Sequence, residues 1–208
     1  MKVLDKLKNK IRLDKKLLVF LTVLLIVGII TGGVFVTILN NSDKALVTEY
    51  LNNFLNNIDA GQVDYLFVIK NNLITNVLYV LIIWLLGISI IGLPIMVIMY
   101  FFKVFTLGFT IGSIILSYNF KGVLFALIYT FPAQVFIILA LLLLMMYAMS
   151  FSFKLIFTIF KKKTMDFKLI MNKYFKILLV CLGIVILMSL YDAYVMPNIV
   201  KTIISFIR

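Results

Sequence analysis

The sequence predicts an all-α, polytopic integral membrane bundle of about five transmembrane helices. Hydrophobic residues make up 64% of the 208 residues, charged residues make up only 13%, and long apolar runs alternate with short basic ones. A soluble globular domain is nearer half apolar and a quarter charged. Because a helix needs about 20 apolar residues to cross a bilayer, the lengths of these runs set the number of spans. We expect one transmembrane domain over residues 1–208.

The first apolar run, 17–39, follows a lysine-rich start and is assigned as the first span. It is too long for the hydrophobic region of a secretory signal, and no small-x-small cleavage site follows it. We therefore expect an uncleaved anchor.

The chain then turns polar over residues 40–72, where apolar side chains recur every four residues, at Leu46, Tyr50, Phe54 and Ile58. This spacing predicts one amphipathic helix, capped by Ser42 and ending near Gly61. Its apolar stripe packs against the bundle, the bilayer surface or a partner protein.

The next apolar run, 73–118, is interrupted only by Lys103 and is long enough for two crossings. The break lies either at Gly92-Leu93-Pro94, where proline removes a helix hydrogen bond, or beside Lys103. We favour Lys103 as an interfacial residue, which gives spans 74–101 and 104–120. Gly92 and Pro94, with Gly87 before them, then form a kink inside the second span.

The last two spans are expected at 132–160 and 177–195. Pro132 begins the fourth span, and an interfacial or re-entrant piece precedes it. A short amphipathic tail to Arg208 follows the fifth.

Charge predicts the orientation, because short basic segments stay in the cytoplasm. Residues 1–16 carry net +5, residues 154–176 carry net +6, and Lys103 adds the last charge of the total +12. We therefore expect basic cytoplasmic segments at 1–16 and 161–176, a cytoplasmic N-terminus and an extracytoplasmic C-terminus. The lysines then serve as orientation signals that also attract anionic membrane lipid, and we expect no nucleic-acid partner.

The sequence offers little chemistry. It has no histidine and a single cysteine, Cys181, so zinc, haem and Cys-His or Ser-His nucleophile sites lack their parts. Asp192 is the one acid near a span, and Asn76, Ser89 and Gln134 are expected to make interhelical hydrogen bonds. We expect no enzyme activity, no cofactor and no metal.

Several motifs follow one another in a fixed order. A block from Trp84 to Gly112 ends in Gly108-Phe109-Thr110-x-Gly112, and after it come Phe131-Pro132-x-Gln134, Ser152-Phe153-Lys154-Leu155 and Asp192-Ala193-Tyr194-x-x-Pro197. This ordered set resembles the stage II sporulation protein M family of endospore-forming Firmicutes, and the block from Trp84 to Gly112 is its most specific part.

The resemblance implies a five-span membrane scaffold for engulfment, located in the mother-cell membrane at the sporulation septum. It implies recruitment of two extracytoplasmic peptidoglycan hydrolases, stage II sporulation protein P and, through it, protein D. We expect partner contacts first at Tyr50 and Phe54, then at Asp192, Tyr194 and Pro197.

Two other interpretations stay open. A small-solute channel or permease subunit could be built around the kinked second span. A homo-oligomer packed through Gly108 and Gly112 is compatible with either function, since a Gly-x-x-x-Gly motif permits close helix approach.

Overall fold

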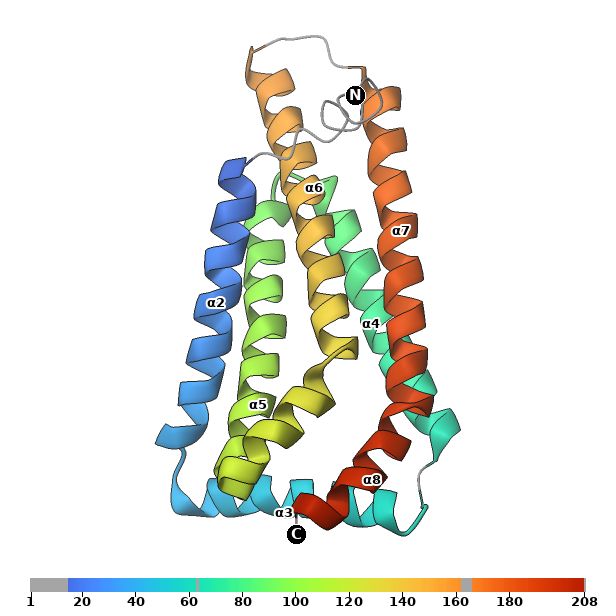
Figure 1. The fold of residues 1–208 in the computed structure, drawn as a ribbon. Helices are drawn as coiled ribbons and strands as arrows, with labels where there is room; N and C mark the ends of the chain where they lie inside the picture. Colours follow the sequence, from blue (N-terminus) through green and yellow to red (C-terminus); the bar gives the residue numbers. More distant parts are fainter. Residues whose placement is uncertain (1–14, 63, 162–165, 208) are drawn as a thin grey trace, which may run out of the picture.

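The computed structural model describes residues 15–62, 64–161 and 166–207, which form a helical bundle (Figure 1). Five helices are long and apolar enough to cross a membrane, as predicted. Two further helices, α3 and α8, lie across one end of the bundle (Figure 1). The helices are α2 (Lys15–Ile38), α3 (Asn41–Asp59), α4 (Tyr65–Gly87), α5 (Gly92–Thr130), α6 (Ala133–Lys161), α7 (Phe167–Tyr194) and α8 (Met196–Ile207).

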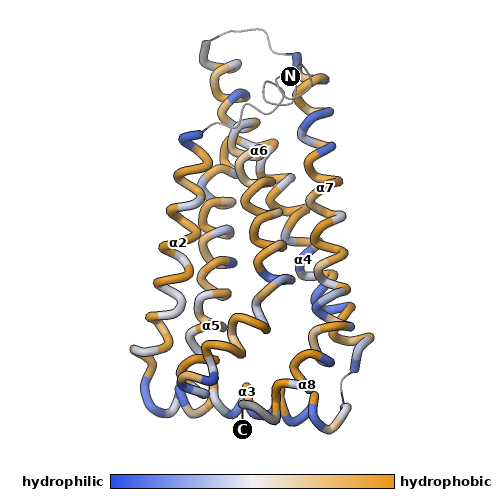
Figure 2. Tube along the Cα trace, viewed as in Figure 1, coloured by the Kyte–Doolittle hydropathy of each residue, from blue (hydrophilic) through white to orange (hydrophobic). Residues whose placement is uncertain are grey.

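The apolar core surrounds α6, the most buried of the five long helices. Ile137, Leu141, Leu144 and Met145 of this helix are almost fully buried, with side chains of α4, α5 and α7 packed around them. Apolar residues run along the long helices, whereas hydrophilic ones gather at both ends (Figure 2). This is the pattern expected of a bundle surrounded by hydrocarbon.

The break in the long apolar run lies between α4 and α5, not at Lys103. α4 ends at Gly87 and α5 begins at Gly92. Gly92 is packed so closely on the carbonyl of Leu86 that a Cβ would collide with it. The predicted spans 74–101 and 104–120 are therefore wrong, and Lys103 lies inside a continuous helix.

Pro94 starts a helix instead of kinking one. It occupies the first turn of α5, where backbone N–H groups have no helical partner and proline costs nothing. Ser152 on α6 closes the turn by donating its hydroxyl to the carbonyl of Gly87, at 2.6 Å. Gly87 itself leaves room for the hydroxyl of Tyr174 and for Ala148.

α5 reverses direction at Asn119, which has φ 52° and ψ −132°. Residues 120–130, here called the arm, turn back and climb between the ends of α5 and α6 (Figure 1). Gly122 consequently lies against Ile114 and Ile115 of the same helix. The arm ends at the cis Phe131–Pro132 peptide, after which α6 begins at Ala133. This is the re-entrant piece expected before Pro132.

A seam of glycines joins α2 to α5. Gly108 packs on the backbone of Ile29, and a Cβ on Gly112 would lie 2.8 Å from the carbonyl oxygen of Gly33. Gly28 and Gly32 supply the matching surface on α2, against Val104 and Phe105. Gly108 and Gly112 thus make the close helix approach that their motif permits within one chain, against α2.

α3 and α8 close one end of the bundle. Leu55 and Ile58 of α3 pack with Val200 and Ile204 of α8 against Phe125 of the arm. Tyr118 and Ser117, at the end of α5, hydrogen-bond to α3 through Asn52 at 2.8 Å and Thr48 at 3.0 Å. α3 is the predicted amphipathic helix, although its cap is Asn40, whose side chain accepts from the N–H of Asp43, and not Ser42.

The first and fourth predicted spans agree closely with α2 and α6, whereas α7 begins at Phe167, well before the predicted 177. Lys168, Lys173 and Lys176 interrupt the apolar run but not the helix. The predicted basic segments lie partly outside the described residues. Their described parts, at the starts of α2 and α7, are at the end of the bundle opposite α3 and α8 (Figure 1).

Candidate functional site

Polar side chains join α4 to α7 in two rungs within the apolar bundle. Asn72 donates to the carboxylate of Asp192 at 3.4 Å, and Asn76 donates to the hydroxyl of Ser189 at 3.2 Å. Asn72 and Asn76 are four residues apart and Ser189 and Asp192 three, so each pair shares one helix face. The two rungs therefore lie one helical turn apart.

Two more helices contribute to these rungs. Lys103 of α5 donates its ammonium to Asn76 Oδ1 at 3.0 Å, and it lies 5.5 Å from the ring centroid of Tyr79. Gln134 of α6 donates to Asp192 Oδ2 at 3.2 Å. We call these six residues, from four helices, the polar cluster: Asn72, Asn76, Lys103, Gln134, Ser189 and Asp192.

Lys103 is the member of the polar cluster that lies deep in the bundle. Val104, next to Lys103, contacts Gly28 near the middle of α2, so Lys103 is far from either end of that helix. The expectation that Lys103 sits at an interface is therefore wrong. Lys103 and Asp192 are within electrostatic reach of each other, but each is hydrogen-bonded to amide side chains, Lys103 to Asn76 and Asp192 to Asn72 and Gln134. The interhelical bonds expected of Asn76 and Gln134 are present.

A cavity of about 320 Å³ opens beside Asp192, at the end closed by α3 and α8. We call it the α3–α8 cavity. Its polar lining includes Asp64, Asp192 and the amide side chains of Asn57, Gln62, Asn71 and Asn72. Its apolar lining includes Phe54, Phe67, Tyr129, Met196, Pro197 and Val200. Three of the five predicted partner-contact residues, Phe54, Asp192 and Pro197, thus lie around one cavity.

The other two predicted contact residues lie outside this cavity. Tyr194 is 53% exposed and stacks on Tyr65, with ring centroids 6.3 Å apart. Tyr50 is 76% exposed and lies one turn before Phe54 on α3. Phe54 itself meets Tyr129 of the arm edge-to-face at 5.9 Å. The five residues therefore belong to one end of the molecule, with aromatic rings exposed beside a cavity that contains carboxylates.

The family model of stage II sporulation protein M matches residues 21–197, from the first span to the start of α8. The chain belongs to the stage II sporulation protein M family. No curated protein and no solved structure matches it. The family and the five apolar helices together make the chain a sporulation-related, multi-pass membrane protein.

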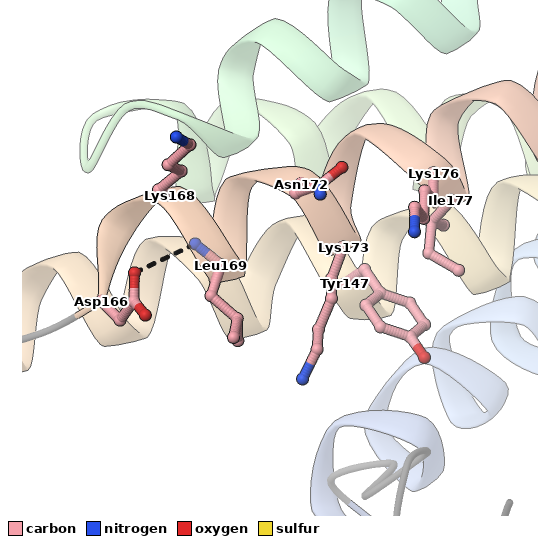
Figure 3. Close-up of a pocket in the computed structure, with 8 residues that line it drawn as sticks. All are labelled: Tyr147, Asp166, Lys168, Leu169, Asn172, Lys173, Lys176 and Ile177. Carbon is pink, nitrogen blue, oxygen red and sulfur yellow. Dashed lines mark hydrogen bonds between the residues drawn. The ribbon is translucent and has the colours of Figure 1, made fainter.

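A second surface of this family member lies at the opposite end, where a groove of about 470 Å³ runs along the start of α7 (Figure 3). Asp166 caps the helix by accepting from the N–H of Leu169, at 3.2 Å. Lys168 and Lys173 point to opposite sides of α7 in Figure 3, so their ammonium groups do not converge on one ligand. Such a spread of lysines fits contact with anionic lipid headgroups over an area of membrane.

Sequence reasoning missed Asn72, Ser189 and the role of Lys103. The spacing of Asn72 and Asn76, and of Ser189 and Asp192, was available as a signal, because each pair repeats at a helical interval. Their pairing across 113 to 120 residues was not available, since nothing in the sequence indicates which helix faces which.

Proposed function

We propose that this chain is a non-enzymatic membrane scaffold of the engulfment complex. In this proposal it recruits stage II sporulation protein P, and through it protein D, to the mother-cell membrane at the septum. Membership of the family supports the setting. The observation that carries the proposal is the grouping of Tyr50, Phe54, Asp192, Tyr194 and Pro197 at the end of the bundle that charge predicts to be extracytoplasmic.

The chemistry of this end suits a protein partner. Exposed aromatic residues are typical of binding hot spots, because they bury much area at low entropic cost. Tyr50 and Tyr194 provide such rings, and Asp64 and Asp192 place carboxylates in the adjoining cavity. A partner segment with an apolar side chain next to a basic one would complement both features.

The test is co-purification of protein P with the full-length chain from sporulating cells. We expect the double change Tyr50→Ala, Phe54→Ala to reduce capture of protein P at least about tenfold, which corresponds to losing one hot spot. Phe20→Ala, at an exposed ring on α2 far from this end, is the control and should leave capture unchanged. If the double variant, at normal protein level, captured as much protein P as the wild type, Tyr50 and Phe54 would not be the contact surface for protein P.

A second candidate function, a small-solute channel or permease subunit, is favoured by the polar cluster. Ionisable residues deep within spans commonly mark a substrate or ion path. Gly92 and Pro94 lie where α5 begins, at the end of the bundle, and so they do not line a path within the spans. Substitutions of Lys103 and Asp192, which belong to the polar cluster, are therefore the ones that should change solute flux. Solute flux in proteoliposomes that is lost with Lys103→Met and Asp192→Asn would support a channel. Capture of protein P without flux supports the scaffold.

A further inference from the structure

Two cavities adjoin where the arm meets α5 and α6, and the larger of them opens to the outside of the bundle beside the exposed Leu127 and Phe131. The smaller, of about 190 Å³, has a polar lining that includes Lys103, Thr106, Thr110, Thr130 and Gln134. The larger, of about 810 Å³, is lined almost wholly by apolar side chains of α5, the arm and α6. Leu107 and Thr130 line both, so the polar and apolar spaces lie side by side.

Two groups at this junction have hydrogen bonds left to make. Thr130 is 94% buried, and its hydroxyl has no hydrogen-bond partner in the structure. Lys103 has three N–H donors, of which Asn76 takes one. Among residues 15–62, 64–161 and 166–207, no carboxylate makes a salt bridge with it. Both an unpaired buried hydroxyl and an ammonium with no carboxylate bound to it are costly within a span.

We propose that these cavities bind a free fatty acid, with its carboxylate at Lys103 and Thr130 and its chain in the larger cavity. A carboxylate accepts several hydrogen bonds and would neutralise the ammonium. The acyl chain would lie against Ile111, Ile115 and Val135, which line the larger cavity. The carboxylate of such a molecule suits the smaller, polar cavity, and its acyl chain suits the larger, apolar cavity.

The depth of Lys103 favours a fatty acid over a phospholipid. Lys103 is level with the middle of α2, so a head group there is roughly 15 Å from either edge of the hydrocarbon layer. A phospholipid would have to bring its phosphate and glycerol to that depth, into the smaller cavity. A fatty acid brings only a carboxylate.

Asp192 does not compete for the same space. It is the nearest opposite charge to Lys103, but its carboxylate is held by Asn72 and Gln134 and lines the α3–α8 cavity instead. Tyr129 lines both that cavity and the smaller cavity, so these two cavities are neighbours. The proposed ligand therefore places its carboxylate in a cavity that Asp192 does not line.

The test uses the full-length protein in nanodiscs of phosphatidylcholine and a photoreactive palmitic acid with a diazirine in its chain. We expect labelling of residues 107–135, located by mass spectrometry, with the methyl ester of the probe labelling about tenfold less. Palmitate should compete, and phosphatidylglycerol should not. Equal labelling by acid and ester would overturn the proposal, as would competition by phosphatidylglycerol but not by palmitate.

Variants test the two halves of the site separately. Lys103→Met should reduce labelling by the acid to the level of the ester, whereas Lys70→Met, at an exposed position of α4, should not. Because Lys103 also holds Asn76, Ile111→Trp provides a second variant, which fills the larger cavity without touching the polar cluster. Undiminished labelling of a folded Ile111→Trp protein would also overturn the proposal.

Discussion

Asn76 is the residue on which the polar cluster depends, because it accepts from Lys103 and donates to Ser189. Replacing it with leucine keeps the size of the side chain but removes both bonds. An interhelical hydrogen bond in a membrane protein contributes about 0.6–2 kcal/mol. Lys103 would also lose its acceptor within the span.

This dependence predicts a coupling between two substitutions. Lys103→Met should destabilise the wild-type bundle more than it destabilises the Asn76→Leu protein, by about 1 kcal/mol in a double-mutant cycle. Thermal unfolding of the four proteins in one detergent measures this. Purely additive effects would show that the ammonium and the amide do not support each other.

The glycine seam gives a second prediction at the same scale. Gly108→Ala adds a Cβ that collides with the backbone of Ile29, so α2 and α5 must separate. We expect a loss of about 1–3 kcal/mol in the free energy of unfolding. Gly183→Ala is the matched control, since a Cβ there meets nothing within 4 Å and alanine is the better helix former. The two variants should differ in thermal stability and in the amount of protein in the membrane.

How much could be predicted differs between these residues. The Gly-x-x-x-Gly at Gly108 was recognised as a packing motif, but its partner Gly28-x-x-x-Gly32 was not, because a sequence does not pair its motifs. A single charge in a long apolar run usually marks a boundary, and this predicts Lys103 at an interface. The exception arises from Asn76, which lies on another helix and accepts from the ammonium inside the bundle while donating to Ser189.

Among the helices, α5 has the most unusual shape, and its reversal at Asn119 can be tested. Positive φ is unfavourable for residues with a Cβ, while glycine adopts it freely. Asn119→Gly should therefore stabilise the protein by up to about 1 kcal/mol, and Asn119→Val should destabilise it.

The control for this prediction is Asn53→Gly, at an exposed position inside α3. Replacing asparagine with glycine in a regular helix should cost about 0.3 kcal/mol, the opposite sign. Thermal unfolding separates the two cases. If Asn119→Gly were as destabilising as Asn53→Gly, the reversal would not depend on the backbone conformation of residue 119.

The number of spanning helices could be predicted because hydropathy counts them well. Their joints could not, since Gly92 and Pro94 are equally compatible with a kink and with the first turn of a new helix. The choice was made by close contact of Gly92 with Leu86 and by the bond from Ser152. Contacts of both kinds are invisible to a hydropathy window.

For the molecule as a whole, the arrangement of the helices sharpens the predicted orientation. The α4–α5 turn, which contains Ser89, lies at the same end as the starts of α2 and α7, and the α3–α4 connection lies at the other (Figure 1). The basic segments are predicted to be cytoplasmic, so the α4–α5 turn should face the cytoplasm and the α3–α4 connection should face outward.

Cysteine labelling checks this arrangement. The one native cysteine, Cys181, is fully buried, so a Cys181→Ser background should tolerate single exposed cysteines. We expect Gln62→Cys to react with a membrane-impermeant maleimide in intact cells, and Ser89→Cys to react only after permeabilisation. The reverse pattern would invert the bundle in the membrane and place the α3–α8 cavity inside the cell.

α3 lies across the ends of the spans and is fastened at several points. It follows directly from α2 and leads into α4, it is hydrogen-bonded to the end of α5, and it packs on α8, which continues α7. A partner that pulls on α3 therefore transmits its force to four membrane-spanning helices at once. If a partner bound to the cell wall pulled on α3, the whole bundle would move as a unit. No single helix would then have to resist extraction from the bilayer alone.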